Sequence, residues 1–238
     1  MLMHTPGAVP GETDVSREGV VVVIDDDASV RAALKELFES VGLNVKLYPS
    51  GSDFLEDGIS DATSCLVLDV RLPTISGLKV QEELARAGLQ VPLIFITEHG
   101  SIATAVQAMK AGAVDFLTKP VNEQDLLDAT FAALARDRMR RAQEEALSEL
   151  RERYRSLSAR EREVLFRVAA GRLNKQIADE LGVSEIMVKV HRSHGMRKMN
   201  ANSIAELVRM SDLLRSEFLT MAAYGNDPPA VTPRKRSR

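Results

Sequence analysis

The stretch VVVIDDDASVR, residues 21–31, decides the fold. It is a continuous apolar run that ends in three aspartates and leads into a helix-like segment. A strand that is apolar at every position is typical of a parallel sheet that helices cover on both faces. The aspartates would then lie at the carboxyl edge of the sheet, where open α/β folds bind their ligands.

Four further strand-like runs follow this one, and helix-like segments with apolar residues at helical spacing separate them. The five runs are Val20–Ile24, Val45–Tyr48, Cys65–Leu68, Leu93–Ile96 and Val114–Leu117. The segments between them are Ala28–Val41, Ser52–Glu56, Leu78–Arg86 and Ile102–Ala111. This alternation predicts an open α/β sheet with parallel strands.

Polar residues follow several of the predicted strands: Asp69 the third, Thr97 the fourth and Lys119 the fifth. They meet Asp25 and Asp26 if the first and third strands are neighbours. Crowded carboxylates repel one another unless a cation lies among them, and Mg²⁺ prefers oxygen ligands of this kind. A carboxylate can also attack phosphorus and form an aspartyl-phosphate, which the metal and Lys119 would stabilise.

A plainer alternative is that the three aspartates only cap the following helix. Polar residues at the ends of three more strands disfavour that alternative as a full account. For Asp27 alone, a cap of the first helix is the preferred interpretation.

Residues 20–134 resemble the receiver domain of two-component response regulators. The matching stretches are VVVIDDDASVR, CLVLDVRLPTISG (65–77) and PLIFITEHGSIATAVQAMKAGAVDFLTKP (92–120). The resemblance implies a flavodoxin-like, doubly wound, five-stranded parallel sheet. It also implies Mg²⁺ as cofactor and a sensor histidine kinase as phosphate donor.

The same resemblance assigns roles residue by residue. Asp69 would be the phosphoacceptor and also a metal ligand, with Asp25 and Asp26 as the acidic metal pair and Asp26 the favoured direct ligand of that pair. The implied roles of the others are a metal-binding backbone carbonyl for Arg71, the switch hydroxyl for Thr97, the switch aromatic for Phe116 and a phosphoryl-binding ammonium for Lys119.

Two residues bear on how this pocket would work. Glu98 follows Thr97, where receivers usually have a small residue, and it either faces solvent without effect or repels phosphodonors and the hydrolytic water. Arg71 occupies the position where phosphatases of the haloacid-dehalogenase type have their general acid, and arginine does not release a proton near neutral pH. A phosphorylated switch is therefore favoured over an enzyme.

Charge divides the chain into two unlike halves. Residues 1–130 contain 9 Lys and Arg against 20 Asp and Glu, whereas residues 158–211 contain 10 against 6. A basic segment fits a polyanionic partner. Between the halves, an approximate spacing of three and four predicts one long helix from about Glu123 to Arg155, which either pairs as a short coiled coil or serves as a solvated spacer.

Residues 157–210 predict a helix-turn-helix. The segment NKQIADEL (174–181) is followed by Gly182, by the helix cap Ser184 and by a second helix, Ser184–Met199, that carries basic residues. The words SAREREVL, NKQIADELGVS, VKVHR and MRKM resemble the LuxR/NarL-type DNA-binding domain. The resemblance implies base-facing Lys189, Val190 and Ser193, DNA contacts from Asn174, and phosphate contacts from Lys175, Arg192 and Arg197.

Two further expectations concern the packing of this half. Helix Ser203–Leu214 would form dimers through Ile204, Leu207, Val208 and Ser211. Gly195, inside the second helix, predicts a less rigid or displaced recognition helix, because a mid-helix glycine costs about 1 kcal/mol relative to alanine.

Composition adds exclusions. The single Cys65 rules out a disulfide framework and a multi-cysteine zinc site, and no apolar run reaches the length of a membrane span. The N-terminus does not resemble a secretory signal, so a cytoplasmic protein without membrane contact is expected.

Together the two halves resemble the FixJ-like branch of the NarL/LuxR response regulators. This implies a phosphorylation-gated transcription regulator, leaning towards activation, that dimerises when phosphorylated and acts on promoter DNA and RNA polymerase. The alternative is a DNA-binding or docking regulator that does not depend on phosphorylation. The expected parts are a flexible tail (1–18), a receiver (19–134), a linker helix (135–152), an all-α helix-turn-helix domain (153–218) and a disordered basic tail (219–238).

Overall fold

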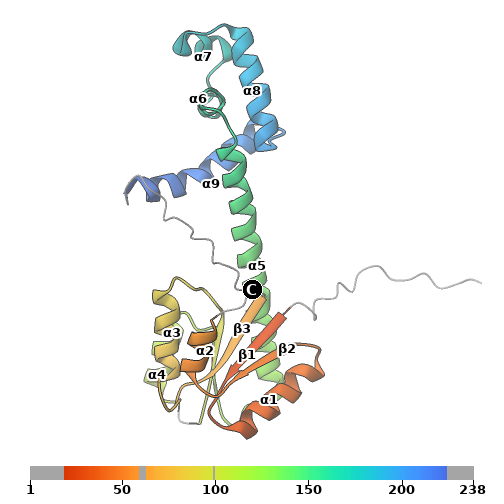
Figure 1. Ribbon diagram of the computed structural model, residues 1–238, viewed down its shortest axis with the longest axis vertical. Helices are drawn as coiled ribbons and strands as arrows, with labels where there is room; N and C mark the ends of the chain where they lie inside the picture. The colour runs from red at the N-terminus through yellow and green to blue at the C-terminus, as the bar shows by residue number, and fades with distance from the viewer. Residues whose placement is uncertain (1–18, 59–62, 99, 224–238) are drawn as a thin grey trace, which may run out of the picture. The chain divides into compact units, whose positions relative to one another are not determined.

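The computed structural model describes residues 19–58, 63–98 and 100–223 (Figure 1). The expected N-terminal tail, 1–18, and residues 224–238 of the expected C-terminal tail lie outside the described residues. The chain divides into two compact units, one ending at Arg141 and the other beginning at Ala142.

A five-stranded sheet with all strands parallel forms the centre of the first unit. Its order is β2-β1-β3-β4-β5, so the first and third strands are neighbours, as the predicted pocket requires. The strands are β1 (Gly19–Ile24), β2 (Asn44–Tyr48), β3 (Thr63–Asp69), β4 (Leu93–Thr97) and β5 (Asp115–Thr118). The predicted doubly wound α/β fold is confirmed.

Helices cover both faces of this sheet because alternate strand residues point to opposite sides. On one face Ile24, Leu68 and Phe95 pack under α2 (Gly51–Asp57), α3 (Gly77–Arg86) and α4 (Ile102–Lys110). On the other face the neighbouring strand residues pack under α1 (Ala28–Ser40) and the first part of α5 (Glu123–Arg155). Figure 1 shows α1 and α3 on opposite sides of the strands.

The beginning of α1 follows the prediction for Asp27. Its side chain accepts a hydrogen bond of 2.7 Å from the backbone N–H of Ser29, which caps the helix. Asp27 therefore serves as the cap of α1, whereas Asp25, two residues earlier, is buried.

Helix α5 begins at Glu123 and ends at Arg155, as its apolar spacing predicts. Within it, the fully buried carboxylate of Asp137 accepts a 2.9 Å hydrogen bond from the backbone N–H of Ser64, at the start of β3. Arg140 and Arg141 donate to the same carboxylate at 2.6 Å each. Burial by itself would raise the pKa of Asp137, but these hydrogen bonds outweigh it and hold the pKa below its ordinary value. The carboxylate therefore ties α5 to the sheet while charged.

The second unit is helical and has its own core, to which Leu150 near the end of α5 also belongs. Its helices are α6 (Ala159–Ala169), α7 (Asn174–Leu181), α8 (Glu185–Met199) and α9 (Ile204–Ala223). Gly182 has a left-handed backbone after α7, at φ 64° and ψ 37°, and Ser184 caps α8 through a bond from the N–H of Met187. The predicted helix-turn-helix is thus present.

Helix α9 corrects two expectations. It continues past Leu214 to Ala223, so residues 219–223 of the expected disordered tail are helical. Leu207 is buried in the core of its own unit, which removes it from the expected dimer-forming set, whereas Ile204 is exposed. Helical spacing alone did not show which side of α9 the core would take.

Gly195 has a packing role that the sequence did not reveal. A Cβ atom at this position would lie 2.8 Å from Cδ1 and 2.9 Å from Cγ of the buried Leu165 in α6. The absence of a side chain therefore allows α6 and α8 to approach closely. Helix α8 is continuous from Glu185 to Met199, so Gly195 does not interrupt it, and the expectation of a less rigid or displaced recognition helix stays a prediction.

We expect Gly195→Ala to destabilise the second unit by about 1–3 kcal/mol, because the new methyl group overlaps Leu165. Helix propensity alone predicts the opposite sign, a gain of about 1 kcal/mol. Native-state hydrogen exchange of the α6 and α8 amides measures the change in the full chain. In a Leu165→Ala background, which removes the overlapping atoms, the same substitution should become stabilising. If it is stabilising in both backgrounds, close packing is not the reason for the glycine.

Candidate functional site

The ammonium group of Lys119 lies between two buried carboxylates at the carboxyl edge of the sheet. Its Nζ donates to Oδ2 of Asp25 at 2.7 Å and to Oδ2 of Asp69 at 2.8 Å. Asp25 follows β1, Asp69 ends β3 and Lys119 follows β5, and the exposed fractions of the two aspartates are only 3% and 8%. The structure therefore brings together three of the side chains that the sequence predicts to converge.

Backbone groups hold the second oxygen of each carboxylate. Oδ1 of Asp69 accepts from the N–H of Arg71 at 2.8 Å, and Oδ1 of Asp25 accepts from the N–H of Asp27 at 2.9 Å. Burial by itself would lower the pKa of Lys119, but the hydrogen bonds and charges of the two carboxylates prevail and raise it. The lysine is therefore a firmly protonated cation.

The net charge at the carboxyl edge of the sheet favours the binding of a second cation. Two carboxylates and one ammonium have a net negative charge, and the exposed Asp26 adds another. In the described ranges, no group of three His, Cys, Asp or Glu side chains is arranged to hold a metal ion, so Asp26 does not form such a group with Asp25 and Asp69. The donors still fit Mg²⁺, which binds through one or two carboxylates and retains several waters. The metal roles of Asp26 and of the Arg71 carbonyl remain predictions.

Thr97 and Phe116 occupy neighbouring strands beside this edge. Thr97 is fully buried at the end of β4, and its carbonyl accepts a 2.9 Å bond from the N–H of Lys119. Phe116 on β5 is half-buried, with its ring centroid 6.0 Å from that of Phe95. A Cβ atom on Gly100 would lie only 2.7 Å from the Phe116 ring, so Gly100 lies against this aromatic side chain.

Gly77 is a positioning residue that sequence reasoning missed. A Cβ atom at this position would lie 2.3 Å from the carbonyl oxygen of Asp69, and the N–H of Gly77 donates to the Val70 carbonyl at 2.9 Å. The glycine lets α3 begin directly against the strand that carries the buried carboxylate. Its place at the end of the stretch 65–77 was the only available signal.

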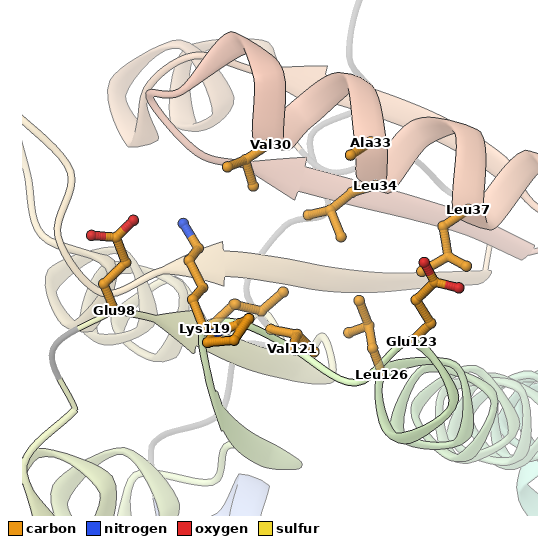
Figure 2. Close-up of a pocket in the computed structure, with 11 residues that line it drawn as sticks. Val30, Ala33, Leu34, Leu37, Glu98, Lys119, Val121, Glu123 and Leu126 are labelled. Carbon is orange, nitrogen blue, oxygen red and sulfur yellow. The ribbon is translucent and has the colours of Figure 1, made fainter.

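A groove of about 700 Å³ adjoins Lys119 (Figure 2). Glu98 and Lys119 lie at one end, and Val30, Leu34 and Leu37 of α1 provide an apolar wall along it. Glu98 is exposed, and its carboxylate lines the same groove as the ammonium group of Lys119.

The second candidate surface is α8 with the start of α7. Val188, Gly195 and Met199 form the buried side of α8, and Lys189, Val190, Ser193 and Arg197 are exposed, as is Lys175 on α7. Arg192 is half-buried, and its Nη1 donates to Oδ1 of Asn174 at 3.0 Å. This bond links the two helices, a contact that the predicted DNA-binding roles of Arg192 and Asn174 did not include.

Glu161 joins α6 to the end of α8. Its Oε2 accepts 2.7 Å bonds from Nζ of Lys198 and from the backbone N–H of Ser158. These bonds, with that of Lys198 contributing most, lower the pKa of the buried Glu161 to about 2. The ionised carboxylate therefore helps to fix the position of α8.

Comparisons with known proteins match both units. Residues 21–131 match the family described as response regulator receiver domain, and residues 155–211 match the family described as bacterial regulatory proteins, luxR family. The chain is 51% identical over 204 residues to Nodulation protein W of Bradyrhizobium diazoefficiens, covering 86% of this chain and 90% of the relative. It is 49% identical over 217 residues to the response regulator protein TodT of Pseudomonas putida, covering 90% and 96%.

A solved structure supports the same similarity. The response regulator StyR aligns with a TM-score of 0.77 at 44% identity, covering 82% of this chain and 98% of StyR. In the ranges that the structure describes, no helix combines the length and apolar character that crossing a bilayer requires.

The Glu161 carboxylate makes the second unit sensitive to acid. Because its pKa is about 2 in the fold and near 4.5 when unperturbed, its stabilising effect is complete above pH 4.5 and is lost as the pH falls towards 2. We expect Glu161→Gln to lower the free energy of unfolding by about 1–3 kcal/mol at pH 7. Hydrogen exchange of α6 and α8 measures this loss. The difference between the two proteins should shrink on acidification, and a constant difference from pH 7 to pH 2.5 would contradict the assignment.

Proposed function

The chain belongs to the response regulators that join a receiver domain to a LuxR-type DNA-binding domain, and from that membership we propose a role for each of its sites. Members of this family are transcription regulators of two-component systems and not enzymes, and phosphorylation gates their activity. Receiver domains typically bind Mg²⁺ at an acidic pocket. The proposals below concern which residues of this chain do the work.

Asp69 is the proposed phosphoacceptor. The observation that carries this proposal is the position of Lys119, which contacts the Asp69 and Asp25 carboxylates with one ammonium group. A carboxylate oxygen of Asp69 attacks phosphorus of a phosphohistidine, the N–P bond breaks and an acyl phosphate forms. The backbone N–H of Arg71 holds the other oxygen in place during this step.

Lys119 changes partner in this mechanism. In the resting pocket its ammonium group contacts both carboxylates and offsets one of their two negative charges, and after transfer it binds a phosphoryl oxygen. The groups that would hold Mg²⁺ are the side chains of Asp25, Asp26 and Asp69 and the carbonyl of Arg71, and the metal would supply further charge neutralisation when bound.

Thr97 and Phe116 are the proposed switch. The Thr97 hydroxyl turns towards the phosphoryl group, and the Phe116 ring moves together with Gly100, which lies against it. Phosphate need favour the active state by only a few kcal/mol to shift the population. The active state is a homodimer that binds promoter DNA in the cytoplasm and acts on RNA polymerase.

DNA binding is assigned to α7 and α8. Lys189, Val190 and Ser193 would face the bases, and Lys175 and Arg197 would contact phosphates. Because Arg192 donates to Asn174, we propose that this pair presents its donors to the DNA backbone as one unit. The domain boundaries proposed for this architecture are 19–134, 135–152 and 153–218.

Asp69→Asn should abolish labelling by radioactive acetyl phosphate, because the amide lacks the nucleophilic carboxylate. Wild-type protein should acquire a stable label only with Mg²⁺ present, and a chelator should prevent labelling. A label that persists on the variant would contradict the assignment of Asp69. Absence of label on the wild type would favour a phosphorylation-independent regulator, and continuous release of phosphate would indicate an enzyme.

Glu98→Gln should accelerate labelling by acetyl phosphate by about three- to tenfold at low ionic strength, since it removes one negative charge from the mouth of a pocket that receives an anion. The advantage should shrink as salt is added. Glu145→Gln, an exposed change of the same charge on α5, is the matched control and should leave the rate unchanged. Equal rates for wild type and Glu98→Gln at low salt would exclude this electrostatic role.

Lys189→Ala should weaken binding to a selected specific duplex by about 1–3 kcal/mol and affect nonspecific duplexes less. Lys175→Ala, assigned to a phosphate, should weaken both duplexes alike and lower the salt slope by about 1. Equilibrium titrations at several salt concentrations separate the two. A uniform loss for Lys189→Ala would move this residue to the phosphate-contact class.

A further inference from the structure

The first turns of α8 expose apolar side chains that do not belong to the hydrophobic core of the second unit. The exposed fraction is 72% for Ile186, 44% for Met187 and 39% for Val190. Single exposed apolar residues are ordinary on protein surfaces, but these three fall within five consecutive residues. They also lie on the helix that the proposed function places in the major groove.

Helical geometry assigns Ile186 to the side of α8 that faces away from the protein. The buried side contains Val188, Gly195 and Met199. Ile186 and Val190 are one turn apart on the opposite side, where Ser193 also falls one turn further on.

Ile186 is also at the end of the helix that approaches bases. Ser184 caps α8, so Ile186 is the second residue of the helix. In helix-turn-helix proteins the N-terminal residues of the recognition helix contact base edges. Ile186 would therefore lie closer to the bases than Ser193, which is about two turns further along the helix.

The chemistry of an isoleucine side chain limits what it can recognise there. It has no hydrogen-bond donor or acceptor, and it would leave polar base edges unsatisfied. The apolar group in the major groove is the C5-methyl of thymine. The charge around the patch supports DNA as its occupant over an apolar protein partner, because Lys189 and Arg197 are exposed on the same helix and Lys175 is exposed on α7.

We propose that Ile186, together with Val190 one turn later, recognises thymine through its C5-methyl group. This inference rests on the proposed DNA-binding function and adds a specificity determinant to it. The preferred half-site then contains thymine at one or two positions where the methyl group contributes to affinity. Met187, on the flank of this side, widens the apolar contact.

The test replaces thymine by deoxyuridine, which lacks only the methyl group. A preferred duplex is first selected from a random pool with the full-length chain, and each thymine in it is then replaced in turn. We expect about fourfold weaker binding at one or two positions, which corresponds to one methyl group leaving an apolar contact. Ile186→Ala should lose a similar factor on the thymine duplex and show no further loss with deoxyuridine at an Ile186 position.

Controls separate methyl recognition from general effects. Ile186→Val, which retains a branched apolar side chain, should keep most of the thymine preference. Leu89→Ala, an exposed apolar change in the other unit, should keep all of it. The inference is overturned if no deoxyuridine substitution weakens wild-type binding. It is also overturned if Ile186→Ala, compared with wild type, loses the same factor of affinity on the thymine duplex and on the deoxyuridine duplex. Both outcomes leave DNA binding intact. Failure to select any duplex overturns the proposed function as well.

Discussion

The pocket depends on one electrostatic constraint, namely that Asp25 and Asp69 are buried side by side and share the ammonium of Lys119. Two buried carboxylates at such close range would repel each other strongly without a cation between them. The lysine is 94 residues from the first and 50 from the second, and the sheet, in which β1 lies beside β3 and β5 two strands further on, brings the groups together. The charge balance of the pocket therefore depends on the strand order.

Features with a repeating local signature were predictable from the sequence. Strands buried on both faces are apolar at nearly every position, so β1, β3 and β4 are recognisable from their composition alone. The extent of α5 followed from apolar spacing without an interrupting Gly or Pro. The meeting of Asp25, Asp69 and Lys119 followed from the rule that parallel strands end at a common edge.

Contacts between distant residues were not predictable in the same way. The bond from Ser64 to Asp137 joins a strand to a helix 73 residues later, and nothing in either segment indicates it. The same is true of the bond between Arg192 and Asn174. For Leu207 the sequence showed the residue in its helix, and for Gly77 it showed only a glycine before a predicted helix. Only the packing shows which neighbour covers Leu207 and which excludes a side chain at Gly77.

The close approach of Leu165 and Gly195 has a consequence for exchanging DNA specificity between relatives. A recognition helix transplanted from a protein with a larger residue at the position of Gly195 would not seat on this scaffold, however well its outward side chains suit the new operator. The graft would need a smaller residue at 165 as well. The two positions are expected to change together in evolution, so the repertoire of recognition helices open to this domain is limited by a side chain that never touches DNA.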